Sequence, residues 1–223
     1  MVTVAGVDDF LSAVPLDIVA VGSGSVMGAV IGVHRRFALM GVIGLAIISG
    51  VGGGLVRDTL LQQGTPAALQ DWRYGIAVLL GGLAGAFFAD AARRLWTVLL
   101  LVDSIALGLF AAIAAGQSLD LGLPAGSAVA VGTTAAVGGW VIRDLVTDVI
   151  PPDLFKPGDL HGAAALVGCT LYVLLVEVAD WSSLAAASAC VAVTFGLRWV
   201  ALWVHLREPL PRDFSPHWFR ESR

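Results

Sequence analysis

Long runs of hydrophobic residues, separated by short polar segments, follow one another along the whole chain. Seven of these runs are close to the ~20 helical residues needed to cross ~30 Å of hydrocarbon. The pattern therefore predicts an all-α integral membrane protein with seven transmembrane helices. The expected spans are residues 11–33, 37–63, 74–92, 95–115, 124–150, 160–179 and 182–205.

The composition agrees with residence in a membrane. Hydrophobic residues make up 57% of the 223 residues and charged residues only 13%, whereas soluble domains carry about 25% charged residues. The formal net charge of −4 and the lack of a basic run argue against nucleic acid as a partner. Cys169 and Cys190 both lie inside apolar runs, so we expect buried packing thiols and no metal site.

Lysine and arginine gather after every second hydrophobic run, that is, after the first, third, fifth and seventh. Because basic residues mark the cytoplasmic side of a membrane protein, the pattern predicts an outside N-terminus and an inside C-terminus. The residues concerned are Arg35, Arg36, Arg93, Arg94, Lys156, Arg207, Arg212, Arg220 and Arg223.

An internal repeat organises the first six spans. Shifting the sequence by 86 residues superposes the first three runs on the next three without a gap, and places the segment 52–58 on 138–144. A unit of three spans is odd, so the second copy enters the membrane from the opposite face. Such inverted repeats place the functional path between the two copies, near the middle of the bilayer. The predicted division is 1–94 for repeat 1, 95–180 for inverted repeat 2, 181–206 for one extra helix and 207–223 for a cytoplasmic tail.

Glycines cluster at the middle of the second and fifth spans, at equivalent positions of the two repeats. Clustered glycines weaken a helix, and backbone carbonyls freed at a break can replace the water shell of an ion. Two helices broken at the midplane and lining an ion path are therefore one interpretation. The other is that the glycines only allow close helix packing, as we expect for the stripe of Gly24, Gly28 and Gly32. The glycines concerned are Gly50, Gly52, Gly53, Gly54, Gly138 and Gly139.

Each glycine cluster is followed by an Arg-Asp pair, Arg57-Asp58 in repeat 1 and Arg143-Asp144 in repeat 2. Ionisable groups at this depth are costly and usually face the interior of the bundle or a water path. Because neighbours on a helix point about 100° apart, we expect each arginine to pair with another helix and not with its own aspartate. The pairs are interpreted either as gate elements or as structural ion pairs between the repeats.

Two further carboxylates, Asp17 and Asp103, begin the first and fourth expected spans at equivalent positions of the repeat. They are candidates for vestibule anions that concentrate cations. They are equally candidates for helix N-terminal carboxylates stabilised by the helix dipole.

The segment GGG-x-x-RD at 52–58, its echo at 138–144 and the three-plus-three-plus-one hydropathy resemble the prokaryotic trimeric intracellular cation (TRIC) channel family. Its bacterial and archaeal members are also grouped under a "glycine transporter" domain name. The resemblance implies a homotrimer with a potassium-permeable pore through each protomer, passing kinked second and fifth helices. Trp140 departs from the family pattern, because it stands where a third glycine would lie, and this implies a stiffer or narrower second half of the pore.

The leading hypothesis is thus a monovalent cation channel, chiefly for potassium, in a bacterial inner membrane. A secondary transporter of a small amino acid such as glycine is the alternative, since inverted repeats with broken helices suit that function too. We expect no enzyme, because no HExxH motif and no nucleophile with a histidine partner is found. No cofactor is expected beyond the permeant potassium ion, with bound lipid left as an open alternative.

Overall fold

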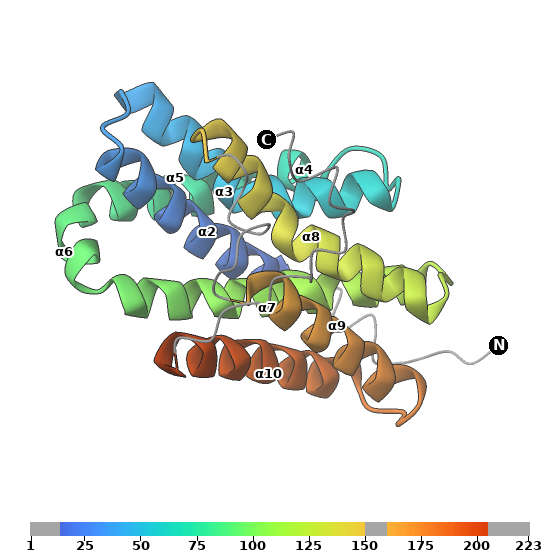
Figure 1. Ribbon diagram of the computed structural model, residues 1–223. Helices are drawn as coiled ribbons and strands as arrows, with labels where there is room; N and C mark the ends of the chain where they lie inside the picture. The colour runs from blue at the N-terminus through green and yellow to red at the C-terminus, as the bar shows by residue number, and fades with distance from the viewer. Residues whose placement is uncertain (1–13, 150–159, 205–223) are drawn as a thin grey trace, which may run out of the picture.

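The computed structural model describes residues 14–149 and 160–204, and within these ranges every regular element is a helix (Figure 1). The expected basic residue Lys156 and the expected tail 207–223 lie outside the described residues. The helices are α2 (Val14–His34), α3 (Leu39–Leu60), α4 (Ala67–Gln70), α5 (Trp72–Phe87), α6 (Ala89–Arg94), α7 (Trp96–Asp120), α8 (Ala125–Val146), α9 (His161–Glu177) and α10 (Ser183–Val204).

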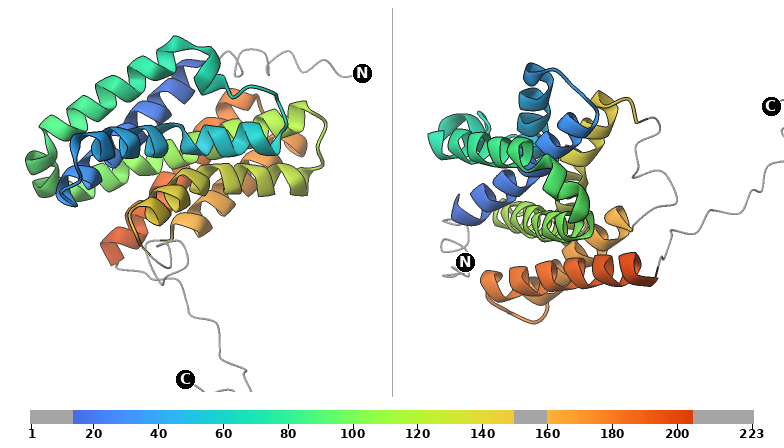
Figure 2. Two further views of the ribbon diagram at one scale, coloured as in Figure 1. Left: turned by 90° about the horizontal axis from the view of Figure 1, so that it is seen from above. Right: turned by 90° about the vertical axis from the view of Figure 1, so that its left-hand side faces the viewer.

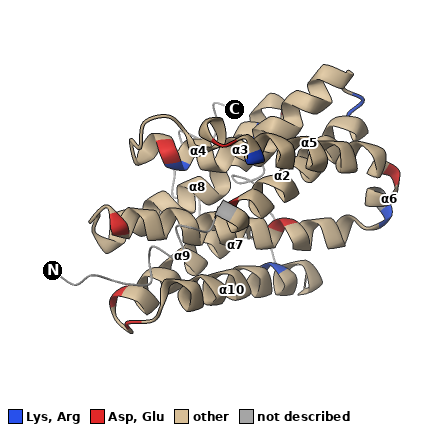
Figure 3. Ribbon diagram, turned by 180° about the vertical axis from the view of Figure 1, so that it is seen from behind, with Lys and Arg blue, Asp and Glu red and all other residues tan. Residues whose placement is uncertain are grey.

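Five of the described helices, α2, α3, α7, α8 and α10, are long and apolar enough to cross a membrane, and α5 and α9 are shorter apolar helices. The chain is therefore an all-helical, multi-pass membrane protein. The single helix expected at 74–92 is wrong, because α5 ends at Phe87 and the short polar helix α6 follows Phe88. The apolar run ends at this point, and the sequence of α6 carries Asp90, Arg93 and Arg94. Figure 3 shows how few charged residues interrupt the remaining helices.

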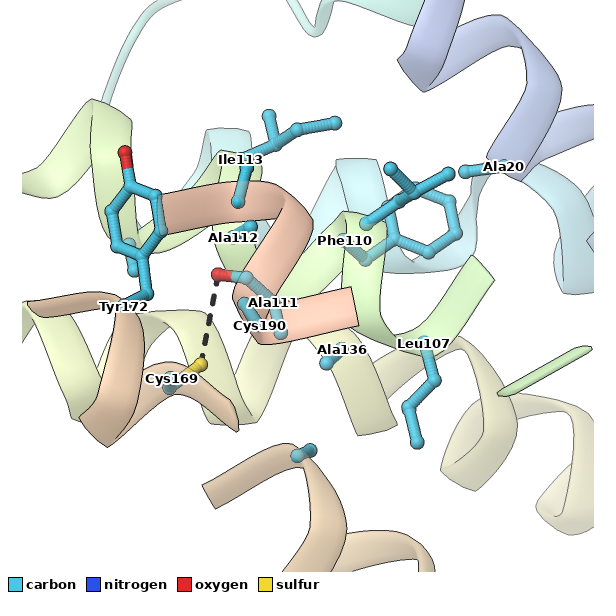
Figure 4. Packing of buried hydrophobic residues seen from close by; sticks show 14 of the residues in the cluster. Ala20, Leu107, Phe110, Ala111, Ala112, Ile113, Ala136, Cys169, Tyr172 and Cys190 are labelled. Carbon is cyan, nitrogen blue, oxygen red and sulfur yellow. Dashed lines mark hydrogen bonds between the residues drawn. The ribbon is translucent and has the colours of Figure 1, made fainter. Parts of the chain in front are cut away.

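Helix α7 lies at the centre of the bundle and packs against α2, α8, α9 and α10. Its stretch from Ala106 to Gly116 is apolar and buried throughout, as expected for a helix segment surrounded by others. The expectation of buried cysteines is confirmed, since Cys169 and Cys190 are free and fully buried against α7. Their thiols donate to the carbonyl oxygens of Ala111 and Gly108, each at 3.6 Å; the first bond is drawn in Figure 4.

Six of the described helices form two groups of three that meet along two contacts. Helices α2, α3 and α5 pack on one another, and so do α7, α8 and α9. The contact between α3 and α8 joins the groups, together with the contact of α2 with α7. Helix α10 covers α7 and α9 and lies along the edge of the bundle (Figures 1 and 2).

The helix ends repeat with the same spacing as the sequence. The chain takes a left-handed conformation just after α2 at Arg36 and, 86 residues later, just after α7 at Gly122. It does so again after α3 at Gln62 and, 86 residues later, after α8 at Asp148. The hydrogen bonds of these turns are equivalent too, for example from the amide of Phe37 to the Gly32 oxygen and from Leu123 to Ser118. The turns that follow α2 and α3 are thus equivalent to those that follow α7 and α8.

Candidate functional site

Helices α3 and α8 touch backbone to backbone at their glycines. A Cβ atom on Gly52 would lie 2.9 Å from the Cα of Gly139, and one on Gly139 would lie 3.0 Å from the amide nitrogen of Gly53. A Cβ on Gly53 would lie 2.9 Å from the carbonyl oxygen of Ala135. No side chain fits between the two helices here, so glycine is required for their approach.

The expected breaks at these glycines are not present. Helix α3 is continuous from Leu39 to Leu60, and α8 is continuous from Ala125 to Val146, so the carbonyl oxygens of the glycines remain within helices. The ~1 kcal/mol that each glycine costs a helix is outweighed by the close contact it permits. Gly50 likewise lies against α2, and Gly138 lies against the side chain of Val56. The packing interpretation therefore describes this conformation.

The stripe of small residues on α2 has the packing role expected for it. Positions for a Cβ on Gly24, Gly28 and Gly32 are occupied by atoms of α3, from Ser49 for Gly24 to Val42 for Gly32. The stripe therefore packs α2 against α3, and another face of α3 contacts α8.

A small cavity, here called the central cavity, lies beside the glycine contact. Its volume of about 10 Å³ is on the order of what one water molecule needs. It is enclosed by α2, α3, α7 and α8, and its lining includes Ser49, Gly53, Asp103, Gly139, Trp140 and Arg143.

Two polar atoms in the lining of the central cavity are buried without a hydrogen bond from any described residue. They are the Oδ2 atom of Asp103 and the Oγ atom of Ser49. A buried polar atom left without a partner costs free energy, and such atoms usually bind water or an ion. The cavity is therefore suited to a water molecule or a small cation.

A first polar cluster, here called the α3 cluster, ties the last turns of α3 to the starts of α2 and α5. The guanidinium of Arg57 lies 2.7 Å (Nε) from Asp58 Oδ1 and 3.3 Å (Nη1) from Asp17 Oδ2. The hydroxyl of Tyr74 donates to the same Asp17 oxygen at 2.7 Å. The other Asp58 oxygen accepts from the backbone amide of Ala67 at 2.8 Å. One buried cation is thus held by two buried carboxylates.

A second polar cluster, here called the α8 cluster, occupies the equivalent place in the second repeat. Arg143 pairs with Asp144 at 3.1 Å, and its guanidinium carbon lies 4.2 Å from the ring centre of Trp140. The ring of His161, from α9, lies 3.8 Å from the Trp140 ring, and the guanidinium carbon of Arg198, from α10, lies 5.5 Å from it. Asp103 interacts electrostatically with Arg143 and Arg198.

The clusters correct two expectations. Each arginine does pair with its own neighbouring aspartate, because its long side chain folds back along the helix. Arg57 also reaches Asp17 on another helix, as expected. Asp17 lies in the first turn of α2, but Asp103 lies well inside α7, which begins at Trp96. The two aspartates are only 5% and 3% exposed, so neither faces an open vestibule in this conformation.

Two members of these clusters, Tyr74 and Arg198, were not among the residues expected from the sequence. A sequence signal exists for Arg198, because it is a lone arginine within the apolar span expected at 182–205, and such residues mark functional interiors. Tyr74 carries no comparable signal, since tyrosine at the start of a span is also typical of the membrane interface.

The two ends of the α3–α8 pair carry different polar contacts. At one end Arg35, which follows α2, donates to the carbonyl oxygen of Thr147 at the end of α8, at 2.7 Å. At the other end an open pocket of about 330 Å³ is lined by Gln63, Gln117 and Asp120. Arg35 therefore joins two helix ends at the first end, and Asp120 contributes a carboxylate to the pocket at the other.

Known proteins resemble the chain over most of its length. A family model described as "Glycine transporter" matches residues 14–90 and 100–177, two segments that begin 86 residues apart. A UPF0126 membrane protein of Deinococcus radiodurans is 34% identical over 88% of this chain and 91% of its own length. The UPF0126 inner membrane protein YadS of Escherichia coli K12 is 24% identical over 87% of this chain and 93% of its own.

Solved structures of TRIC channels have the same fold. The TRIC trimeric intracellular cation channel orthologue from Rhodobacter sphaeroides superposes with a TM-score of 0.79, at 27% identity, over 86% of this chain and 98% of its own. A TRIC cation channel studied for its conductance superposes with a TM-score of 0.80, at 25% identity, over 90% of this chain and 98% of its own.

The family model covers more than half of the chain, and its two matches follow the repeat seen in the helix ends. The glycine contact and the paired polar clusters lie within the matched segments, apart from Arg198, which belongs to α10 outside them. The chain therefore belongs to the glycine transporter family of membrane proteins and has the fold of the prokaryotic TRIC channels.

Proposed function

We propose that the chain is a monovalent cation channel, chiefly for potassium, with a pore between α3 and α8 of each protomer of a homotrimer. The observation that carries the proposal is the central cavity, where Asp103 Oδ2 and Ser49 Oγ lack hydrogen bonds from described residues. A carboxylate and a hydroxyl are oxygen ligands that can replace water around a small cation. The cavity has room for about one water molecule, so under this proposal the conformation corresponds to a closed channel.

The relatives support both the activity and the assembly. The two structures of at least 25% identity are named as cation channels, and one of them as trimeric. This chain matches almost all of each of those channels.

The arrangement of helix ends supports seven spans with the N-terminus outside and the C-terminus inside. In that topology the first and fifth spans end on the inner face, and the second and fourth end on the outer face. The bond from Arg35 to Thr147 joins the ends of α2 and α8, which are the first and fifth spans. The pocket lined by Gln63 and Asp120 joins the ends of α3 and α7, which are the second and fourth. Arg35 then lies on the inner face, as the positive-inside rule requires.

In this mechanism a hydrated cation enters the outer mouth beside Asp120 and loses part of its water shell at the central cavity. The α3 cluster closes the path on one side of the cavity and the α8 cluster closes it on the other. Arg57 stays close to neutralised by Asp17 and Asp58, so it closes the path through its ion pairs and not as a bare charge that repels potassium. Opening requires α3 and α8 to separate at their glycines.

The test is a planar-bilayer recording of the purified protein in asymmetric potassium chloride. We expect discrete current steps that reverse near the potassium equilibrium potential. The variant Asp103→Asn should lower the unit conductance, while Asp90→Asn on α6, which is exposed, should leave it unchanged. A silent bilayer with verified incorporation of folded protein would overturn the proposal.

A transporter of glycine is the second candidate, favoured by the two buried Arg-Asp pairs, which offer a guanidinium and a carboxylate to a zwitterion. The central cavity is too small for an amino acid in this conformation, which favours the channel. Saturable, gradient-coupled uptake of labelled glycine into liposomes, without current steps, would reverse that preference.

A further inference from the structure

We propose that Trp140, held in place by Arg198 of α10, plugs the half of the ion path that belongs to the second repeat. The proposal rests on the channel function proposed above, because a plug has meaning only for a path. It assigns to α10, the helix outside the repeat, a role in closing the pore.

The first observation is that one position of the repeat carries very different side chains in the two copies. Trp140 is the counterpart of Gly54, 86 residues earlier. A Cβ on the buried Gly54 would meet only the end of the Arg57 side chain, at 3.7 Å, so the first repeat has no large side chain at this position. In the second repeat the same position carries the largest side chain found in proteins, and Trp140 lines the central cavity.

The second observation is that the ring of Trp140 is held by side chains from three helices. Arg143 comes from α8 itself, His161 from α9 and Arg198 from α10. Guanidinium groups within about 6 Å of an indole ring are attracted to it, most strongly where water is excluded. Arg198 is 0% exposed, so water is excluded from its contact with the indole ring.

These contacts give the two halves of the pore different gates. In the first half, a cation leaving the central cavity meets the α3 cluster, which opens when Arg57 and Asp17 separate. In the second half it meets an indole ring with guanidinium groups beside it, so the obstacle is one of size as well as charge. The ring must turn away before a hydrated ion can pass, and Arg198 opposes that movement.

The test compares unit conductance and open probability of the full-length protein and its Trp140→Gly variant, in bilayers with asymmetric potassium chloride. We expect the variant to raise the open probability by about tenfold, the order expected when a desolvated contact of this type is lost. Arg198→Leu, which keeps the indole but removes its restraint, should give a smaller increase. The matched control is Trp203→Gly, which removes an exposed tryptophan from α10, the helix that also carries Arg198. This control should behave as the wild type.

Moving the plug provides a second arm. In a Trp140→Gly background, Gly54→Trp places the indole in the first repeat, at a position where a Cβ meets only the end of the Arg57 side chain. The double variant should return to low open probability, which a merely space-filling role of Trp140 in the packing of α8, α9 and α10 would not produce.

The outcomes separate this proposal from the channel function itself. Wild-type currents together with an unchanged, folded Trp140→Gly variant would overturn the plug and leave the channel in place. If that variant does not fold, Trp140→Phe and Arg198→Leu decide, and unchanged currents in both would overturn it. Silence of every variant, the wild type included, would remove the channel function and the plug with it.

Discussion

The guanidinium of Arg57 lies 3.3 Å from the carboxylate of Asp17, and this pair fastens the end of α3 to the start of α2. The same carboxylate oxygen accepts the hydroxyl of Tyr74 at the start of α5. Three helices of the first repeat therefore meet at one buried oxygen atom. Any movement of α3 away from its neighbours at this end has to break these contacts.

Removing the cation of this pair should destabilise the closed protein. In Arg57→Gln, two buried carboxylates lose their counter-ion, and breaking a buried pair in this way costs about 3–5 kcal/mol. We expect a lower unfolding temperature of the solubilised protein, and a higher open probability in bilayers. Arg94→Gln, at the exposed end of α6, is the control and should change stability by less than ~0.5 kcal/mol. Equal stability and equal gating of the two variants would contradict the role given to Arg57.

Because of the glycine contact between α3 and α8, the effect of a Gly→Ala substitution on stability should depend strongly on its position. Gly139→Ala places a methyl group 3.0 Å from the amide nitrogen of Gly53, and overpacking of this kind costs about 1–3 kcal/mol. Gly44→Ala, also in α3, meets nothing within 4 Å and should be neutral or slightly stabilising. Thermal unfolding of both variants measures the difference. A neutral Gly139→Ala variant would show that the two helices are free to separate.

The carboxylate of Asp120 at the outer mouth should raise the conductance by raising the local concentration of cations. Asp120→Asn removes a negative charge from the pocket that also contains Gln63 and Gln117. We expect a lower unit conductance in dilute potassium chloride and little change at ~1 M salt, where the screening length falls to about 3 Å. A reduction of the same size at every salt concentration would point to a structural effect in place of an electrostatic one.

The repeated helix ends identify positions where glycine is missing. Gln62 has a φ of 51°, and Gly122, which ends α7, shows that the fold accepts glycine in such a turn. Because a side chain in this conformation costs about 1–2 kcal/mol, we expect Gln62→Gly to stabilise the protein, with Gly122→Ala as the opposite change. Unfolding temperatures that move in the same direction for both variants would contradict this account of the turns.

Much of the architecture follows from hydrophobic pattern and repeat, because lipid leaves few alternatives to apolar helices. The same pattern does not reveal where a helix stops inside an apolar region, so the division of α5 from α6 at Phe88 was missed. The sequence shows the two glycine clusters, but whether they break a helix or bring two helices together depends on the neighbouring helix. For Gly53 and Gly139 that neighbour lies 86 residues away in the sequence.

The polar residues show the same limit. The pair of Arg57 with Asp17 follows from burial, since two charges at this depth need each other. The position of Arg198 beside Trp140 cannot be derived from burial in this way, because it depends on how α10 packs across α7 and α9. Long side chains add to the uncertainty, as Arg57 and Arg143 both reach back to the adjacent aspartate.

Gly53 and Gly139 are counterparts in the repeat, and they touch each other. A residue that contacts its own copy lies on a two-fold axis, which is the signature of an isologous dimer. The contact of α3 with α8 thus has the form of a homodimer interface, although both sides of it belong to one polypeptide. In a true homodimer every substitution appears twice, on both sides of the axis. Within one polypeptide that constraint is absent, so glycine at 54 can coexist with tryptophan at 140.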